Sequence, residues 1–119
     1  MIIGKTFKFE SAHCLEGHAK CGQMHGHTYK LTVEVDGQIQ HDGMVMDLHL
    51  LSEIVQEVIA THDHRCLNDL YSVSTCEVMA SAILHNLIQK FKERGLFPFP
   101  RLHSVTLQEG EGGYAKIYR

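Results

Sequence analysis

Two stretches of alternating residues near the start of the chain constrain its fold most strongly. In residues 2–13 one face of an extended segment carries Phe7, Phe9, Ser11 and His13, and the other carries Lys8, Glu10 and Ala12. Residues 29–35 alternate in the same way and end at the turn signal Asp36-Gly37. The pattern therefore predicts two strands joined by a loop, which come close to each other if they pair in antiparallel fashion.

The rest of the chain predicts two helices followed by two more strands. Apolar residues recur at helical spacing after Asp47, which is a favourable N-cap. Ser74-Thr75-Cys76-Glu77 has the form of a capping box with Ser74 as the cap, and Gly95 stops the helix that follows. The expected elements are strands over 2–13 and 25–35, helices over about 48–60 and 75–94, and strands over 102–108 and 114–118, with a loop over 61–73.

This order of elements predicts an α+β fold with a four-stranded antiparallel sheet and both helices on one face. The chain of 119 residues is expected to form a single domain over residues 1–119. A chain of this size gains stability from oligomerisation. The uncovered face of the sheet must be polar or must pack against another subunit.

Composition excludes several classes of function. The net charge of −3 gives no general reason to bind nucleic acid or an anionic membrane. No apolar run approaches the roughly 20 residues of a membrane span, and the start of the chain lacks the apolar stretch of a signal peptide. We therefore expect a cytoplasmic protein. In that reducing compartment the four cysteines, none in a CxxC pair, are core residues, metal ligands or nucleophiles.

Three histidines are placed to bind a metal ion. His25 and His27 are two residues apart, so on a strand both rings point to the same face. His13 ends the preceding strand, and antiparallel pairing brings it close to them. A single histidine is more often a surface residue, but three imidazoles with an open fourth position are typical of catalytic zinc. His18 is a possible spare ligand, although a surface position is favoured for it.

Cys21 has two interpretations. A free cysteine is commonly a small buried hydrophobic residue. Cys21, however, lies in a polar loop between Lys20 and Gly22, four residues before His25. A nearby cation favours the thiolate, which acts as a base or as a nucleophile.

Two acidic features further along the chain can each be interpreted either as ordinary surface residues or as functional residues. Asp63-His64 is either an ordinary surface dipeptide or a carboxylate that orients an imidazole. Glu109 is either a solvated residue at a strand end or a carboxylate that binds an amidine-like N–H pair of a ligand, such as a pterin or guanine, through two parallel hydrogen bonds.

These motifs together resemble the 6-pyruvoyl-tetrahydropterin synthase and 6-carboxytetrahydropterin synthase family over nearly the whole chain. Each motif is weak by itself, and their order and spacing are specific. The matching segments are Phe9-Glu10-Ser11-Ala12-His13, Cys21 with His25-Gly26-His27, Gly43-Met44-Val45-Met46-Asp47-Leu48, Asp63-His64 with Leu67-Asn68, Ser74-Thr75-Cys76-Glu77, and Val105 through Glu109.

The resemblance implies roles for these residues. It implies that a catalytic Zn2+ is held by His13, His25 and His27. It also implies that Cys21 is a proton-abstracting thiolate partnered by Asp63 and His64, and that Glu109 anchors the pterin ring with help from Thr75.

The resemblance also implies an assembly. In the tunnelling fold of this family, the sheets of three subunits join into a barrel, two rings stack into a homohexamer, and active sites lie at subunit interfaces. This leaves open whether Glu109 and Thr75 serve the zinc of their own chain or of a neighbour.

The spacing before His25 distinguishes branches of the family. Three residues separate Cys21 from His25, and none is glutamate. This is similar to the carboxy-synthase branch, which converts dihydroneopterin triphosphate to 6-carboxytetrahydropterin, acetaldehyde and triphosphate for queuosine synthesis. The alternatives are the pyruvoyl synthase, an aldolase-like dihydroneopterin cleaver, and a non-catalytic zinc- or pterin-binding module.

Overall fold

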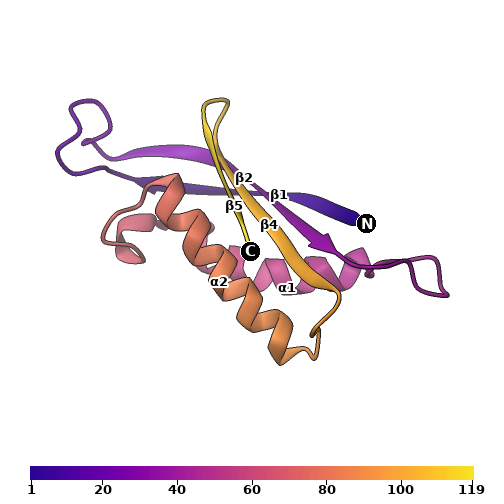
Figure 1. The fold of residues 1–119 in the computed structure, drawn as a ribbon. Helices are drawn as coiled ribbons and strands as arrows, with labels where there is room; N and C mark the ends of the chain where they lie inside the picture. The colour runs from indigo at the N-terminus through magenta and orange to yellow at the C-terminus, as the bar shows by residue number, and fades with distance from the viewer.

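The computed structural model describes residues 1–119 as an α+β fold in which two helices cover one face of a five-stranded sheet (Figure 1). The predicted order of the longer elements is confirmed. The elements are β1 (Ile2–His13), β2 (His25–Asp36), α1 (Leu48–His62), β3 (Arg65–Cys66), the 3₁₀ turn η1 (Leu67–Asp69), α2 (Cys76–Glu93), β4 (Arg101–Glu109) and β5 (Tyr114–Tyr118).

The strands lie in the order β3-β1-β2-β4-β5. The predicted antiparallel pairing of β1 with β2 is confirmed along their whole length, and its register sets His13 opposite His25 and Ser11 opposite His27. The pairs β2–β4 and β4–β5 are also antiparallel. No helix is both long enough and apolar enough to span a membrane.

The prediction of a four-stranded, purely antiparallel sheet is wrong in one respect. Residues 65–66, expected to be loop, form the fifth strand β3, which runs parallel to β1 and makes the sheet mixed. A two-residue strand is too short to show an alternating pattern. It forms because the chain leaving α1 runs along the free edge of β1, where unpaired backbone groups are available.

Both helices begin at capping residues. The side chain of Asp47 accepts a hydrogen bond from the backbone N–H of His49 at 2.8 Å, which confirms the predicted cap of α1. The predicted cap of α2 is wrong by one residue, because Thr75 and not Ser74 accepts from the N–H of Val78. Ser74 is fully buried and contacts His13 instead.

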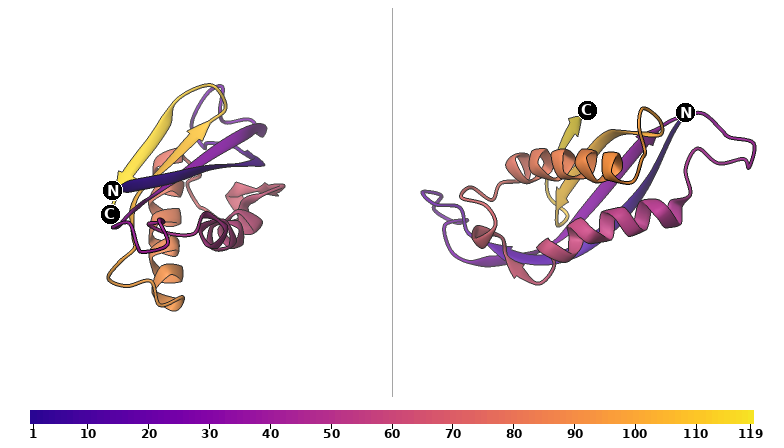
Figure 2. Two further views of the ribbon diagram at one scale, coloured as in Figure 1. Left: turned by 90° about the vertical axis from the view of Figure 1, so that its right-hand side faces the viewer. Right: turned by 90° about the horizontal axis from the view of Figure 1, so that it is seen from below.

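The core lies between the sheet and the helices, which Figure 2 shows together on one side of the sheet. On β2 the residues at alternate positions from Tyr29 to Val35 are all fully buried. Burying each large apolar side chain contributes about 1.5–3 kcal/mol. His25 and His27 continue the same face of β2 toward its start, so the histidines extend the core-facing side of the sheet.

One buried histidine belongs to the fold and lies outside this cluster. His62 ends α1, and its Nδ1 donates to the carbonyl of Val58 at 2.8 Å while its Nε2 accepts from the Tyr71 hydroxyl at 2.6 Å. Its ring packs against Phe9, and its carbonyl accepts from the Ser11 hydroxyl. Both ring nitrogens are thus satisfied in the neutral form, and burial lowers the pKa of His62.

We predict that His62 makes the fold sensitive to acid. The unfolded chain takes up a proton at the ordinary histidine pKa of about 6.5, before folded His62 does. The stability that neutral His62 provides is therefore complete above that pH, and it is lost as the pH falls through the lowered pKa. Urea unfolding between about pH 7.5 and 5 should show a smaller loss of stability for His62→Leu than for wild type. The exposed control His85→Ala should keep the wild-type slope. An equal slope in His62→Leu would contradict this assignment.

Candidate metal centre

The structure brings the three predicted histidines together at one end of the β1–β2 pair. The ring centroid of His25 lies 4.7 Å from the ring centroids of both His13 and His27. The ring centroids of His13 and His27 are 5.2 Å apart. Glu109 at the end of β4 joins them. One potential ligand atom from each of these four residues lies within 4.8 Å of the other three.

Hydrogen bonds to the backbone fix the tautomers of two of these histidines. His13 Nδ1 lies 2.9 Å from the carbonyl oxygen of Ser74, and His25 Nδ1 lies 2.7 Å from the carbonyl oxygen of Gln23. A carbonyl can only accept, so each Nδ1 carries the proton and each Nε2 keeps a lone pair. This is the usual arrangement around a metal-binding histidine.

The free nitrogens fit a metal ion. Nε2 of His13 is buried and makes no hydrogen bond, and Nε2 of His27 is buried with only the Glu109 carboxylate beside it, at 2.9 Å. A buried polar atom without a partner costs about 1–3 kcal/mol, and coordination removes that cost. Burial also lowers the pKa of His27, an effect that the nearby Glu109 opposes, and this favours the neutral imidazole that a metal requires. The donor set therefore suits a divalent metal ion.

Glu109 lies in the cluster of its own chain. Its Oε1 is 2.9 Å from His27 Nε2 and 3.9 Å from His13 Nε2, while its Oε2 accepts from the Cys76 thiol at 3.5 Å. Thr75, His27 and Glu109 line a single pocket of about 570 Å³ that extends to the β4–β5 turn. Glu109 and Thr75 therefore lie beside the histidine cluster of their own chain.

Two groups that the sequence did not indicate, Cys76 and Tyr29, stay neutral near this carboxylate. Burial, and secondarily Glu109, raises the pKa of the Cys76 thiol to about 12. The pKa of Tyr29, whose side chain is fully buried, is raised by the same causes. Both groups keep their protons at neutral pH. The alternating pattern placed Tyr29 on the face of His27, but nothing in it identified the hydroxyl as part of a site.

Cys21 lies outside the metal cluster, in the loop that joins β1 to β2. Its backbone N–H donates to His18 Nδ1 at 3.0 Å, and its carbonyl accepts from the N–H of Leu15 at 2.6 Å. A Cβ on Gly22 would lie 2.3 Å from the His18 carbonyl oxygen, so only glycine fits this tight loop. His18 therefore supports the loop and is not one of the four clustered ligands.

Asp63 and His64 are attached to the free edge of β1. Asp63 Oδ1 accepts from the N–H of Glu10 at 2.9 Å and lies 3.0 Å from His64 Nδ1, while the His64 N–H donates to the Glu10 carbonyl at 2.6 Å. The bond from Glu10, followed by that from His64, lowers the pKa of Asp63 and keeps it charged. His64 is the only residue other than glycine with a positive φ, 55°. Such backbone strain is commonly found at functional sites.

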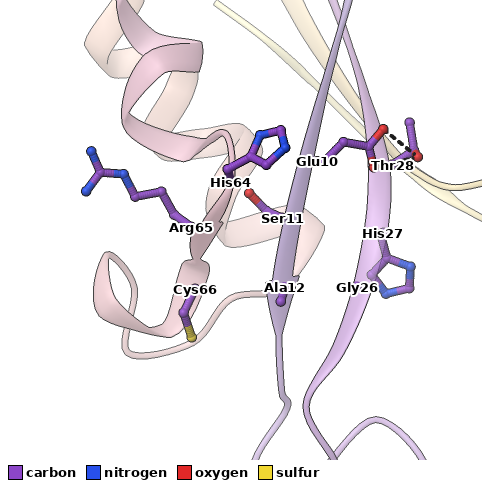
Figure 3. Close-up of a pocket in the computed structure, with 9 residues that line it drawn as sticks. All are labelled: Glu10, Ser11, Ala12, Gly26, His27, Thr28, His64, Arg65 and Cys66. Carbon is purple, nitrogen blue, oxygen red and sulfur yellow. Dashed lines mark hydrogen bonds between the residues drawn. The ribbon is translucent and has the colours of Figure 1, made fainter.

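No polar contact joins the Asp63–His64 pair to Cys21 within one chain. His64 is 79% exposed and lines a pocket of about 510 Å³ with outward-facing groups such as Glu10 and Thr28. Figure 3 shows the ring of His64 beside β1 and the ring of His27 directed away on the far side of β2. None of the polar contacts of Cys21 involves Asp63 or His64. The three expected partners are therefore brought together only in part.

Comparison with known proteins gives a consistent result. A family model described as 6-pyruvoyl tetrahydropterin synthase matches residues 2–119. A putative 6-carboxy-5,6,7,8-tetrahydropterin synthase of Archaeoglobus fulgidus is 40% identical over 119 residues, covering all of this chain and 96% of the relative. The 6-carboxy-5,6,7,8-tetrahydropterin synthase of Synechocystis sp. is 36% identical over 115 residues, covering 91% and 85%. The Caenorhabditis elegans 6-pyruvoyl tetrahydropterin synthase structure superposes with a TM-score of 0.84 at 25% identity, covering 100% and 95%.

We predict that His27→Ala abolishes tight metal binding. Losing even a partner of a ligand weakens metal affinity about 10–100-fold, so loss of the ligand itself should exceed about 100-fold. Metal content after dialysis, measured by atomic emission, checks this. His85→Ala is the matched control, because His85 lies on α2 and bonds only to its own helix. Full metal occupancy in His27→Ala would disprove the assignment.

Proposed function

This chain belongs to the 6-pyruvoyl tetrahydropterin synthase family, and we propose that residues 1–119 act as a zinc-dependent lyase. The proposed reaction consumes 7,8-dihydroneopterin triphosphate and one water, and it yields 6-carboxy-5,6,7,8-tetrahydropterin, acetaldehyde and triphosphate. The atoms balance without an external reductant. The observation that carries the proposal is the cluster of three imidazoles beside a carboxylate-lined pocket. The names of the carboxy-synthase relatives support the choice of product, and queuosine synthesis in the cytoplasm is the proposed setting.

In this proposal His13, His25 and His27 hold the zinc ion. When bound, zinc supplies a Lewis acid that polarises the substrate's side chain and makes its C–H bonds more acidic. The bonds from His13 and His25 to backbone carbonyls orient their rings for this task.

Glu109 is the proposed anchor for the pterin ring. The 2-amino group and adjacent ring N–H of a pterin form a donor pair that matches the two oxygens of one carboxylate. Glu109 lies on the wall of the pocket, next to the Gly-rich β4–β5 turn, and Thr75 lines the same wall. This places the proposed ring site beside the metal cluster.

Cys21 is the proposed base that removes a carbon-bound proton, and His64, oriented by Asp63, is the proposed relay for protons of the side chain. Because Asp63 and His64 lie at the edge of β1 and make no polar contact with Cys21, we propose that a second copy of the chain supplies them. The barrel trimer or hexamer of the tunnelling fold would place active sites at such interfaces.

The decisive experiment is incubation of the zinc-loaded protein with 7,8-dihydroneopterin triphosphate, followed by mass analysis. Acetaldehyde together with a carboxypterin is the expected result. A pyruvoyl product without acetaldehyde would instead identify a 6-pyruvoyl-tetrahydropterin synthase. Binding of zinc and pterin without turnover would identify a non-catalytic binding module.

We predict that two inactive variants restore each other's activity. Cys21→Ala should keep its zinc and lose turnover, because the thiol is a base and not a ligand; His64→Ala should also be inactive. If the two residues come from different chains, oligomers reassembled from an equal mixture should contain both intact residues at about a quarter of the sites. Turnover near one quarter of wild type is therefore expected. No recovery in verified mixed oligomers would argue that both residues come from one chain.

A further inference from the structure

Tyr29 carries a hydroxyl that has no hydrogen-bond partner, although the side chain is fully buried. Its ring stacks on Phe9 at 5.0 Å and meets the rings of His13 and His27 edge-on at 6.2 and 5.7 Å. Phenylalanine would make the same ring contacts without burying an unpaired hydroxyl, which is costly. The hydroxyl therefore needs an explanation beyond packing.

Glu109 is the acceptor that the strand register places beside Tyr29. Tyr29 and Glu109 are directly paired across β2 and β4, so both side chains leave the same face of the sheet. One carboxylate oxygen of Glu109 faces His27, and the other accepts from Cys76. The carboxylate thus lies between the metal-binding nitrogens and the Cys76 thiol, with Tyr29 paired to it on the neighbouring strand.

The position of this carboxylate decides what kind of metal site the cluster forms. If Glu109 binds the metal with the three histidines, four protein ligands close the shell, as in a structural zinc site. If Glu109 is held away, the fourth position stays open and the carboxylate is free for a ligand in the pocket. The geometry of the four donor atoms is compatible with closure, so an open site requires another group that holds Glu109 away.

We propose that Tyr29 is a positioning residue: when a metal ion binds the three histidines, the unpaired Tyr29 hydroxyl donates to Glu109 and, together with Cys76, holds this carboxylate off the metal. A phenol that donates to a carboxylate forms a short, charge-assisted hydrogen bond. A thiol is a weak donor and is not sufficient alone. Tyr29 thereby keeps the metal site open and directs Glu109 toward the pocket. This inference rests on the proposed function insofar as it assumes a metal at the three histidines.

The test uses Tyr29→Phe with Co2+ in place of zinc, because Co2+ has a visible spectrum that reports its ligands. Azide should change the spectrum of the wild-type protein by entering the open position. In Tyr29→Phe, Glu109 should occupy that position, so the azide concentration for half-maximal change should rise about tenfold or more. Chelator competition should show that Tyr29→Phe holds the metal more tightly than wild type. A merely structural loss would not tighten metal binding.

Ligand binding gives a second measurement. The affinity for 7,8-dihydroneopterin, which lacks the triphosphate, should fall about tenfold in Tyr29→Phe. In a Glu109→Ala background, adding Tyr29→Phe should cause no further loss and should leave the azide response intact, because the residue to be positioned is gone.

Tyr71→Phe is the matched control. The Tyr71 hydroxyl bonds to His62 and lies outside the metal cluster, so its removal should leave the azide response and pterin affinity unchanged. A Tyr29→Phe protein with wild-type azide response and metal affinity would overturn this inference and leave the proposed function standing. A wild-type protein that takes up no Co2+ would overturn both.

Discussion

The antiparallel register of β1 and β2 is the constraint on which the rest of the structure depends. It runs through every residue of both strands and sets His13 opposite His25 at their end. A slip of one residue would turn the whole face of one strand over, which would expose its apolar residues and move its histidines to the opposite side. The free energy of burying Leu31, Val33 and their neighbours therefore also fixes the place of the metal cluster.

The start of α2 joins the helical layer to this cluster. Ser74 is fully buried, and its carbonyl orients His13, while the next residue, Thr75, caps the helix. Cys76, the first helical residue, contacts Glu109 on β4. Because three consecutive residues contact the site, the packing of α2 and the geometry of the metal donors are coupled. The Ser74 hydroxyl lies 3.2 Å from His13 Nδ1, so it is turned away from the helix and the cap lies at Thr75.

The sequence predicted those features that repeat with a clear period. The strands, the helices and the meeting of His13 with His25 and His27 follow from periods of two and 3.6 residues and from turn signals. The strand β3 was missed because two residues have no period. The role of Tyr29 was missed because an alternating pattern assigns it to the core and says nothing about its hydroxyl. The position of Asp63 and His64 at the open edge of β1 was missed because order along the chain does not show on which edge of a sheet a loop lies.

The proposed oligomer would explain both the exposed position of Asp63-His64 and the free edges of the sheet. β5 forms one edge, and β3 covers only Ser11 and Ala12 on the other, so most of β1 is an unpaired edge. Open edges are a liability unless another strand pairs with them. The edge of β1 also carries the strained and exposed His64. The polar contacts of His64 within its own chain are limited to Glu10 and Asp63. Pairing of edges between subunits would cover the unpaired backbone and bring a second chain to these residues. A barrel of subunits would therefore cover the open edges of the sheet and complete the proposed site through the same contact.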